Sequence, residues 1–332
     1  MAGGGFRFGY YLGIYAAMRQ LDKTPDLLLA SCGGAIAAGI IQHFSDDDQR
    51  KEWICSPEMY QFWLGMKSSK QATISRSLAG ALGRGFSKRY AHTIPDLFND
   101  YLFDIPLQLP TPTASPENHA TAVAIIAGKL LFSEDEVGQP RNNRKLFAET
   151  VFCEPRAAAL LSGMHSPMGE GKWKDSAIAA DILTDVNMPI EQAARASVSD
   201  MVYFRCHSYQ GSHYIGGVVD LFPIEIANQL AEQVTMEFKG PYDKLFSIPA
   251  LRSVLGINGN QRLQHVLQQR ADLWFDTSDM EQALVENQIV KNISWRSNRI
   301  ELRLPQTYSN YVKMIEAQWE YGFQRGLSAF SR

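Results

Sequence analysis

The spacing of apolar residues predicts the elements at the start of the chain. Apolar residues recur every three to four positions over residues 9–21, which predicts a helix. Residues 27–29 are leucines, a run typical of a strand buried on both faces. A tight turn at 31–34 leads into a small, apolar segment at 35–43 that predicts a buried helix. The chain therefore begins as helix, strand, turn and helix.

The same patterns continue towards the C-terminus. Strands are predicted over residues 121–127, 146–153, 201–205, 212–215 and 300–304, and helices over 190–196 and 223–230. The last helix carries an apolar stripe that indicates a core-facing side, formed by Tyr308, Tyr311, Val312, Ile315, Trp319 and Phe323. Strands that alternate with helices predict an α/β fold, with a mostly parallel central sheet and helices on both faces. We expect a single domain over 1–332, with a helical lid or insert at 44–118 and a C-terminal helical extension at 240–332.

Composition and charge narrow the class of protein. Hydrophobic residues make up 45% of the 332 residues and charged residues 20%, which is ordinary for a globular protein. The net charge of -3 gives no case for nucleic acid as a partner. Four cysteines without a CxxC pair argue against a structural zinc site and suit a reducing compartment. With no leader-like start and no long apolar run, we expect a cytoplasmic protein.

The turn at 31–34 has the sequence of a nucleophile elbow. A strand that feeds a sharp turn and then a helix lifts one side chain above the sheet, and small residues must flank that side chain. Here the raised residue is Cys32, with Ala30, Gly33, Gly34 and Ala35 around it. The helix that follows favours a thiolate at Cys32 through its N-terminal dipole. A buried, inert cysteine in a tight turn is the alternative interpretation.

Backbone amides near Cys32 complete the candidate site. The backbone N–H of Gly33 can point at a developing oxyanion. The N–H groups of Gly4 and Gly5 can complete this oxyanion hole. No cofactor and no metal is expected, since Cys206, His207 and His213 lack a third well-placed ligand.

Three segments in order resemble the patatin-like acyl hydrolase family. They are the Gly-Gly-Gly-x-Arg segment at 3–7 followed by Gly13, the elbow at 30–35, and the block at 214–223 that is similar to Asp-Gly-Gly-Val-Val-Asp-Asn-x-Pro. The segment at 193–197 is similar to the family's Ala-x-x-Ala-Ser. The resemblance implies a three-layer, Rossmann-like sandwich and a Ser–Asp dyad that hydrolyses or transfers acyl groups of lipids.

The sequence departs from the family pattern where the dyad should lie. The serine position is occupied by Cys32 and the aspartate position by Ile215, which cannot take a proton. Other departures are Phe8 for the glycine after Arg7, Ala30 for the first glycine of the elbow, and Leu221 for asparagine. The resemblance implies a structural role for Asp220.

Another base is therefore needed if Cys32 is a nucleophile. His213 lies two residues before Ile215, on the same face if this segment is a strand, and can reach towards Cys32 as a Cys–His pair. A strand-end histidine without a catalytic role is the alternative, and His207 is a weaker candidate. Ser31 is a second candidate nucleophile, although its side chain should point away from the tip of the elbow.

A basic stretch suggests partners. It contains Lys67, Lys70, Arg76, Arg84, Lys88 and Arg89 without an intervening acid. Such a stretch can dock on an anionic membrane surface or an acyl carrier protein, or it can be the solvated face of a helical lid. We expect a cysteine-dependent acyl hydrolase or acyltransferase acting on an acyl ester or thioester. The alternative is a catalytically inactive protein that binds acyl chains or a partner.

Overall fold

The computed structural model describes residues 1–76, 91–110, 112 and 120–331. Its first elements are a 3-10 helix η1 (Gly5–Arg7), helix α1 (Gly9–Gln20), strand β1 (Leu27–Ser31) and helix α2 (Gly33–His43). The predicted order of helix, strand, turn and helix is therefore confirmed. The remaining helices are α3 (Asp47–Ile54), α4 (Pro57–Leu64), η2 (Glu134–Glu136), α6 (Pro155–Leu160), η3 (Gly171–Trp173), α7 (Ile190–Ser197), η4 (Gly217–Val219), α8 (Ile224–Leu230), α9 (Ser247–Leu255), α10 (Gly259–Val266), α11 (Met280–Ala283) and α12 (Tyr308–Phe330).

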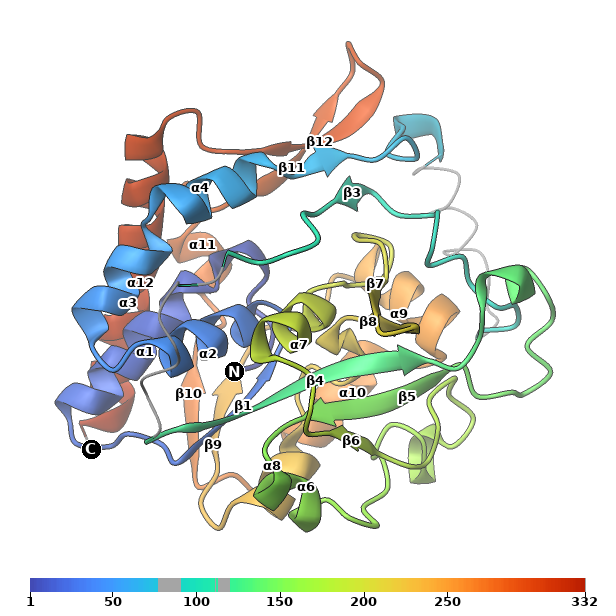
Figure 1. The fold of residues 1–332 in the computed structure, drawn as a ribbon, viewed down its shortest axis with the longest axis horizontal. Coiled ribbons are helices and arrows are strands. Elements are labelled where there is room, and N and C mark those ends of the chain that lie inside the picture. Colours follow the sequence, from blue (N-terminus) through green and yellow to red (C-terminus); the bar gives the residue numbers. More distant parts are fainter. Residues whose placement is uncertain (77–90, 111, 113–119, 332) are drawn as a thin grey trace.

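The central sheet is built around one long strand, β4 (Ala122–Leu130) (Figure 1). It continues through β5 (Phe147–Phe152) and β6 (Leu183–Asp185) on one side of β4, and through β8 (Ser212–Ile215) and β7 (His207–Tyr209) on the other. β1 also pairs with β4. β1–β4 and β5–β6 are parallel, whereas β4–β5, β4–β8 and β7–β8 are antiparallel.

The sheet thus combines parallel with antiparallel pairs. The antiparallel pairing of β7 with β8 follows from the short connection between them. The two strands form a tight hairpin with its turn at Gln210 and Gly211, and the strands of a hairpin must be antiparallel. Short strand pairs outside the main sheet are β2 (Lys67–Ser68) with β3 (Phe103–Asp104), β9 (Thr235–Phe238) with β10 (Leu273–Asp276), and β11 (Val290–Ser294) with β12 (Arg299–Arg303).

Helices cover both faces of the sheet. One apolar cluster joins β1 and β4 to α1, α2, α7 and α12, and a second cluster packs α6, α8 and α9 against the other face. Alternate residues of β1 serve the two clusters, with Leu28 in the first and Leu29 in the second. The run of leucines therefore forms a strand buried on both faces, as predicted.

The C-terminal helix α12 packs along α1, and Figure 1 shows both helices at the left of the molecule. Tyr311, Ile315 and Trp319 of the predicted stripe are buried, whereas Tyr308 is exposed. The helices approach closely because each has a glycine against the backbone of the other. A Cβ at Gly322 would collide with the carbonyl of Tyr10, and a Cβ at Gly13 would collide with the carbonyl of Trp319.

One predicted strand is absent. Residues 201–203 form a turn, and the strand that pairs with β8 begins only at His207. The backbone carbonyl of Asp200 accepts hydrogen bonds from the amides of Tyr203 and Phe204, which closes the turn. Of the apolar residues at 201–204 that resemble a strand, Met201, Tyr203 and Phe204 line the cavity described below. Across the described ranges, no helix is both long enough and apolar enough to cross a bilayer.

Substituting Gly322→Ala should destabilise the protein by about 1–3 kcal/mol, because the new methyl group enters a backbone contact that cannot open locally. Urea unfolding measures the change. The matched control is Gly39→Ala in α2, where a Cβ meets no atom within 4 Å. That change should leave stability unaltered or raise it by up to ~1 kcal/mol through helix propensity. Equal losses for both variants would contradict the proposed packing.

Candidate active site

The elbow lies where three segments meet at the middle of β4. β1 ends at Ser31 opposite Ile126, and β8 ends at Ile215 opposite Gly128. Both strands run along the same side of β4, so the residues that follow them come together. These residues are Cys32 and the glycine pair after Ile215. The sheet topology therefore places the elbow beside the family-like block at 214–223.

Cys32 has a strained backbone, with φ 52° and ψ -127°. A side chain in this region costs of order 1–3 kcal/mol and persists only where its surroundings enforce it. Here its amide donates to Ser197 Oγ at 2.8 Å, and Ser197 Oγ donates to the Ile126 carbonyl at 2.6 Å. A Cβ at Gly33 would lie 2.6 Å from the Gly5 carbonyl oxygen. The predicted elbow geometry is present, and Gly33 is needed for the approach of the glycine-rich loop.

The Cys32 thiol donates a hydrogen bond to Asp200. Cys32 Sγ lies 3.2 Å from Asp200 Oδ2. Asp200 lies just beyond α7, in the turn that replaces the predicted strand. Sequence reasoning missed this residue. A signal was present, since Asp200 is the only acid between Glu191 and Asp220 and lies three residues after the segment similar to Ala-x-x-Ala-Ser.

Burial sets the protonation states of this pair. Burial raises the pKa of Asp200 to about 7, against opposing hydrogen bonds from Cys32 and the Val218 amide. Burial, and then the charge and hydrogen bond of Asp200, raise the pKa of the Cys32 thiol well above its usual value. The helix terminus was expected to favour a thiolate, and this expectation is corrected. The resting thiol holds its proton and presents it to a carboxylate.

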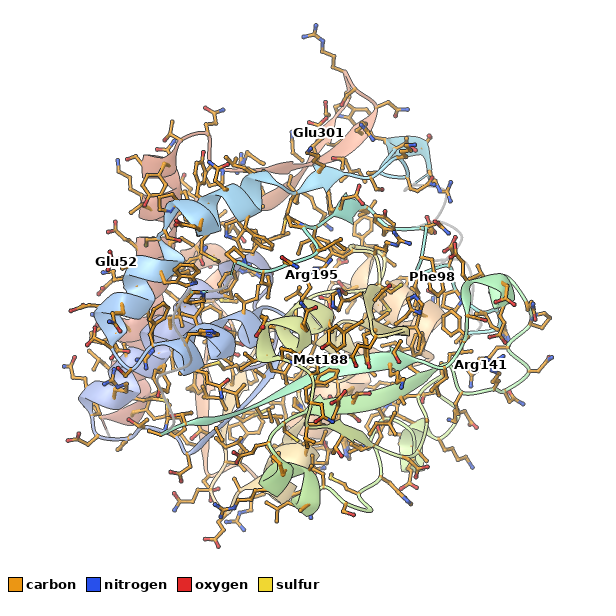
Figure 2. All side chains as sticks on the ribbon, viewed as in Figure 1. Glu52, Phe98, Arg141, Met188, Arg195 and Glu301 are labelled. Carbon is orange, nitrogen blue, oxygen red and sulfur yellow. The ribbon has the colours of Figure 1, made fainter. Side chains whose placement is uncertain are left out.

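Several contacts hold Asp200 in place. Arg195 is buried, and its guanidinium donates to Ser199 Oγ at 2.6 Å and to the Pro106 carbonyl at 2.9 Å, so it ties the end of α7 to the segment after β3 (Figure 2). The Gly216 amide donates to the Ser199 carbonyl at 2.8 Å. A Cβ at Gly216 would collide with Asp200 Oδ1. The absence of a side chain at Gly216 therefore makes room for the carboxylate.

The glycine-rich loop lies against the elbow, as predicted. The Gly3 amide donates to the Ser31 carbonyl at 3.1 Å, and the Gly34 amide donates to the Gly3 carbonyl at 2.8 Å. Gly3, Gly4 and Gly5 all have positive φ, so a residue with a side chain would be strained at each position. Gly5 and Gly33 line the cavity at Cys32, whereas Gly4 is not among the lining residues.

A cavity of about 540 Å³ opens at Cys32 and Asp200. Its wall is mainly apolar and includes Trp63, Met66, Ile105, Phe204, Leu221 and Leu251. Arg7 and Lys291 add cations to the wall. The volume lies in the range of small-molecule sites. An apolar cavity with a thiol in its wall has the character of a site for an acyl chain.

The family model of the patatin-like phospholipases matches residues 1–228. The chain belongs to this family. The family consists of lipid acyl hydrolases, and the resemblance seen in the sequence is confirmed. A search of curated proteins returned no match.

The patatin-like block at 214–223 is present without its acid. Ile215 is fully buried and packs against Gly128 of β4. The two glycines after it are nevertheless needed, because a Cβ at Gly217 would lie 2.5 Å from Ser31 Cβ and 2.9 Å from the Cys32 nitrogen. The carboxylate beside the Cys32 thiol thus comes from the segment after α7 and not from the end of β8.

Neither of the two candidate histidines, His213 and His207, lines the cavity at Cys32. The ring of His213 packs edge-on against Phe98 at 5.1 Å between centroids. The thiol is therefore paired with Asp200 and not with His213. His207 Nε2 contacts Gln192 Oε1 at 3.0 Å, and burial lowers the His207 pKa to about 4. Ser31 is fully buried, with Oγ 3.4 Å from the Leu221 carbonyl, so it points away from the tip.

A buried cation supports the glycine-rich loop from beneath. Lys239 Nζ donates to the Ala2 carbonyl at 2.5 Å and lies 3.4 Å from Glu237 Oε2. Tyr10 and Tyr11 each donate to Glu237 at 2.6 Å. The Lys239 charge acts to lower the pKa of Cys32, although burial and Asp200 outweigh it. Lys239 lies beyond residue 228, so the C-terminal part of the chain contributes to the site.

The basic stretch is described only in part. Arg76 forms an ion pair with Asp100 at 3.4 Å, and Lys67 and Lys70 are exposed. Arg84, Lys88 and Arg89 lie outside the described residues. Among the residues that the structure describes, no group of three or more His, Cys, Asp or Glu side chains could hold a metal ion.

Activity of this site should require ionised Asp200. Because burial raises the pKa of Asp200 to about 7, kcat/KM for an acyl ester should rise tenfold per pH unit below pH 7 and level off above it. Measuring kcat/KM for a soluble ester as a function of pH tests this rise below pH 7. A profile that is flat between pH 5 and 8 would contradict the role of Asp200 as base.

The same pKa predicts a stability change. Asp200 takes up a proton on folding between its ordinary pKa of 3.8 and about 7, so stability falls as pH rises through this window. Asp200→Asn removes the buried charge. We expect its Tm to exceed that of wild type by several degrees at pH 8, with a smaller difference at pH 5. A lower Tm for Asp200→Asn at pH 8 would contradict the raised pKa.

Proposed function

We propose that this protein is a cysteine-dependent lipid acyl hydrolase or acyltransferase that acts on an acyl ester or thioester. The observation that carries the proposal is the 3.2 Å hydrogen bond from Cys32 Sγ to Asp200. This Cys–Asp pair occupies the nucleophile elbow of a patatin-like fold, beside the glycine-rich loop and an apolar cavity. Asp200 replaces the histidine base that the sequence alone suggested.

The reaction follows from the geometry in two stages. Cys32 Sγ attacks the acyl carbonyl carbon as its proton passes to Asp200, and the carbonyl oxygen becomes an oxyanion near the Gly5 and Gly33 amides. The bond from carbon to the leaving oxygen or sulfur then breaks. The leaving group takes the proton from Asp200, and the acyl group remains on Cys32 as a thioester. Water or an acceptor alcohol releases it in the second stage.

A carboxylate base is needed here even though the nucleophile is a thiol. In water, a few per cent of a thiol is ionised at neutral pH, so cysteine enzymes often use only a weak partner. Burial raises the pKa of Cys32 well above its usual value and removes that advantage. The proton must therefore leave during attack, as it does from a serine. Asp200, with a pKa of about 7, is suited to accept and return it.

A second candidate function is acyl-chain binding without turnover. The raised pKa of the thiol favours it, since a protonated, buried cysteine is a poor nucleophile. The apolar cavity would then serve as a binding site alone. Acylation of Cys32 distinguishes the two candidates.

Incubation with a long-chain acyl thioester should add one acyl group to the protein, as measured by intact mass. Cys32→Ala should abolish the adduct because the nucleophile is lost. Asp200→Asn should slow acylation by about 10²–10⁴-fold, since general base catalysis is lost while the amide preserves the shape.

Cys32→Ser is a more informative variant. It places a hydroxyl against the same carboxylate and recreates a Ser–Asp pair, so measurable ester hydrolysis should persist. His213→Ala serves as the control and should acylate at the wild-type rate. If wild type forms no adduct with ester or thioester donors, the binding function is favoured. Loss of acylation in His213→Ala would contradict Asp200 as the base.

A further inference from the structure

Two exposed apolar segments flank the cavity. Leu245 and Phe246, in the loop before α9, are 73% and 59% exposed, and the next residue, Ser247, lines the cavity. Trp295 is 76% exposed at the turn of the β11–β12 hairpin. Lys291, at the base of that hairpin, also lines the cavity. Large apolar side chains exposed to this extent beside a site indicate a contact surface.

The two segments adjoin the same cavity, because Ser247 follows the loop and Lys291 lies on β11. The pKa of Asp243 is lowered: burial opposes the shift, whereas the amides of Phe246, Leu245 and Ser247 and the Lys291 charge favour it. The field of the hairpin lysine therefore reaches the loop. Figure 1 shows the hairpin projecting from the body of the molecule. The base of the hairpin, through Val290 and Lys291, and Ser247 after the loop line the same cavity.

Cations are interleaved with these apolar side chains. Lys244, Lys291 and Arg296 are exposed, although the chain as a whole has a net charge of -3. We call the surface made by Lys244, Leu245, Phe246, Ile293, Trp295 and Arg296 the rim patch. Ile293 is 50% exposed and lies between Lys291 and Trp295 on β11 and its turn.

We propose that the rim patch docks on an anionic phospholipid bilayer and so presents the cavity mouth to the lipid surface. Tryptophan and phenylalanine are stable at the boundary between head groups and acyl chains, and lysine and arginine pair with anionic head groups. That docking presents the cavity to its lipid substrate rests on the proposed function. Docking on the bilayer itself needs no chemistry at Cys32.

A second copy of the chain fits the rim patch less well. A twofold contact would bring the same cations of two protomers together, and like charges across an interface oppose association. A bilayer with anionic lipids instead provides a complementary charge. It also accepts two protruding segments without requiring a matching groove.

Co-sedimentation with sucrose-loaded vesicles tests the proposal. The wild-type protein should bind vesicles of phosphatidylcholine with phosphatidylglycerol more tightly than vesicles of phosphatidylcholine alone, and salt should weaken this binding. The double variant Phe246→Ser/Trp295→Ser should lose about tenfold or more in partitioning, because two aromatic anchors are removed. Arg296→Gln should reduce only the preference for anionic vesicles.

Matched controls separate docking from folding and from catalysis. Leu160→Ser removes a leucine that is 45% exposed on α6, which Figure 1 places at the opposite end of the molecule from the hairpin, and it should bind like wild type. Cys32→Ala should also bind vesicles like wild type, even if no acyl transfer is found. Equal binding by wild type and the double variant would overturn the proposal. So would a concentration-dependent dimer that only the double variant loses, without vesicle binding.

Discussion

The buried hydrogen bond between Cys32 and Asp200 is the interaction on which the site depends. It joins the end of β1 to the end of α7, and it explains three features around it. Gly216 must lack a side chain to admit the carboxylate, Ser197 must fix the Cys32 amide, and Arg195 must hold the turn that carries Asp200. Each contact constrains a residue that has no direct part in the proposed chemistry.

Burial has opposite consequences for the proposed catalysis and for stability. Taking the carboxylate out of water raises its pKa to about 7, which suits a base that must also return a proton. The same desolvation makes the ionised carboxylate costly to the folded protein. A site that loses stability in order to hold an active charge is a common pattern in enzymes. The nearby Glu237 and Lys239, by contrast, are paired with each other.

The C-terminal third of the chain is integral to the site even though the family match ends at residue 228. Lys239 supports the glycine-rich loop, α9 supplies Leu251 to the cavity, and β11 supplies Lys291. α12 packs on α1 through glycines that lie against the backbone of the other helix. The region beyond the family match thus contributes to the same core and the same cavity as the matched part.

The sequence by itself determined the local elements and the elbow. The leucine run, the glycines around Cys32 and the apolar stripe of α12 each follow from local periodicity or from backbone conformations that only small residues adopt. The tertiary structure decided which acid meets the thiol. Asp200 and Cys32 are 168 positions apart. They meet because Ser197, at the end of α7, bonds both the Cys32 amide and the Ile126 carbonyl of β4, opposite the end of β1. Contacts at such separation depend on strand order and sense, and the sequence pattern did not determine either of these for the mixed sheet.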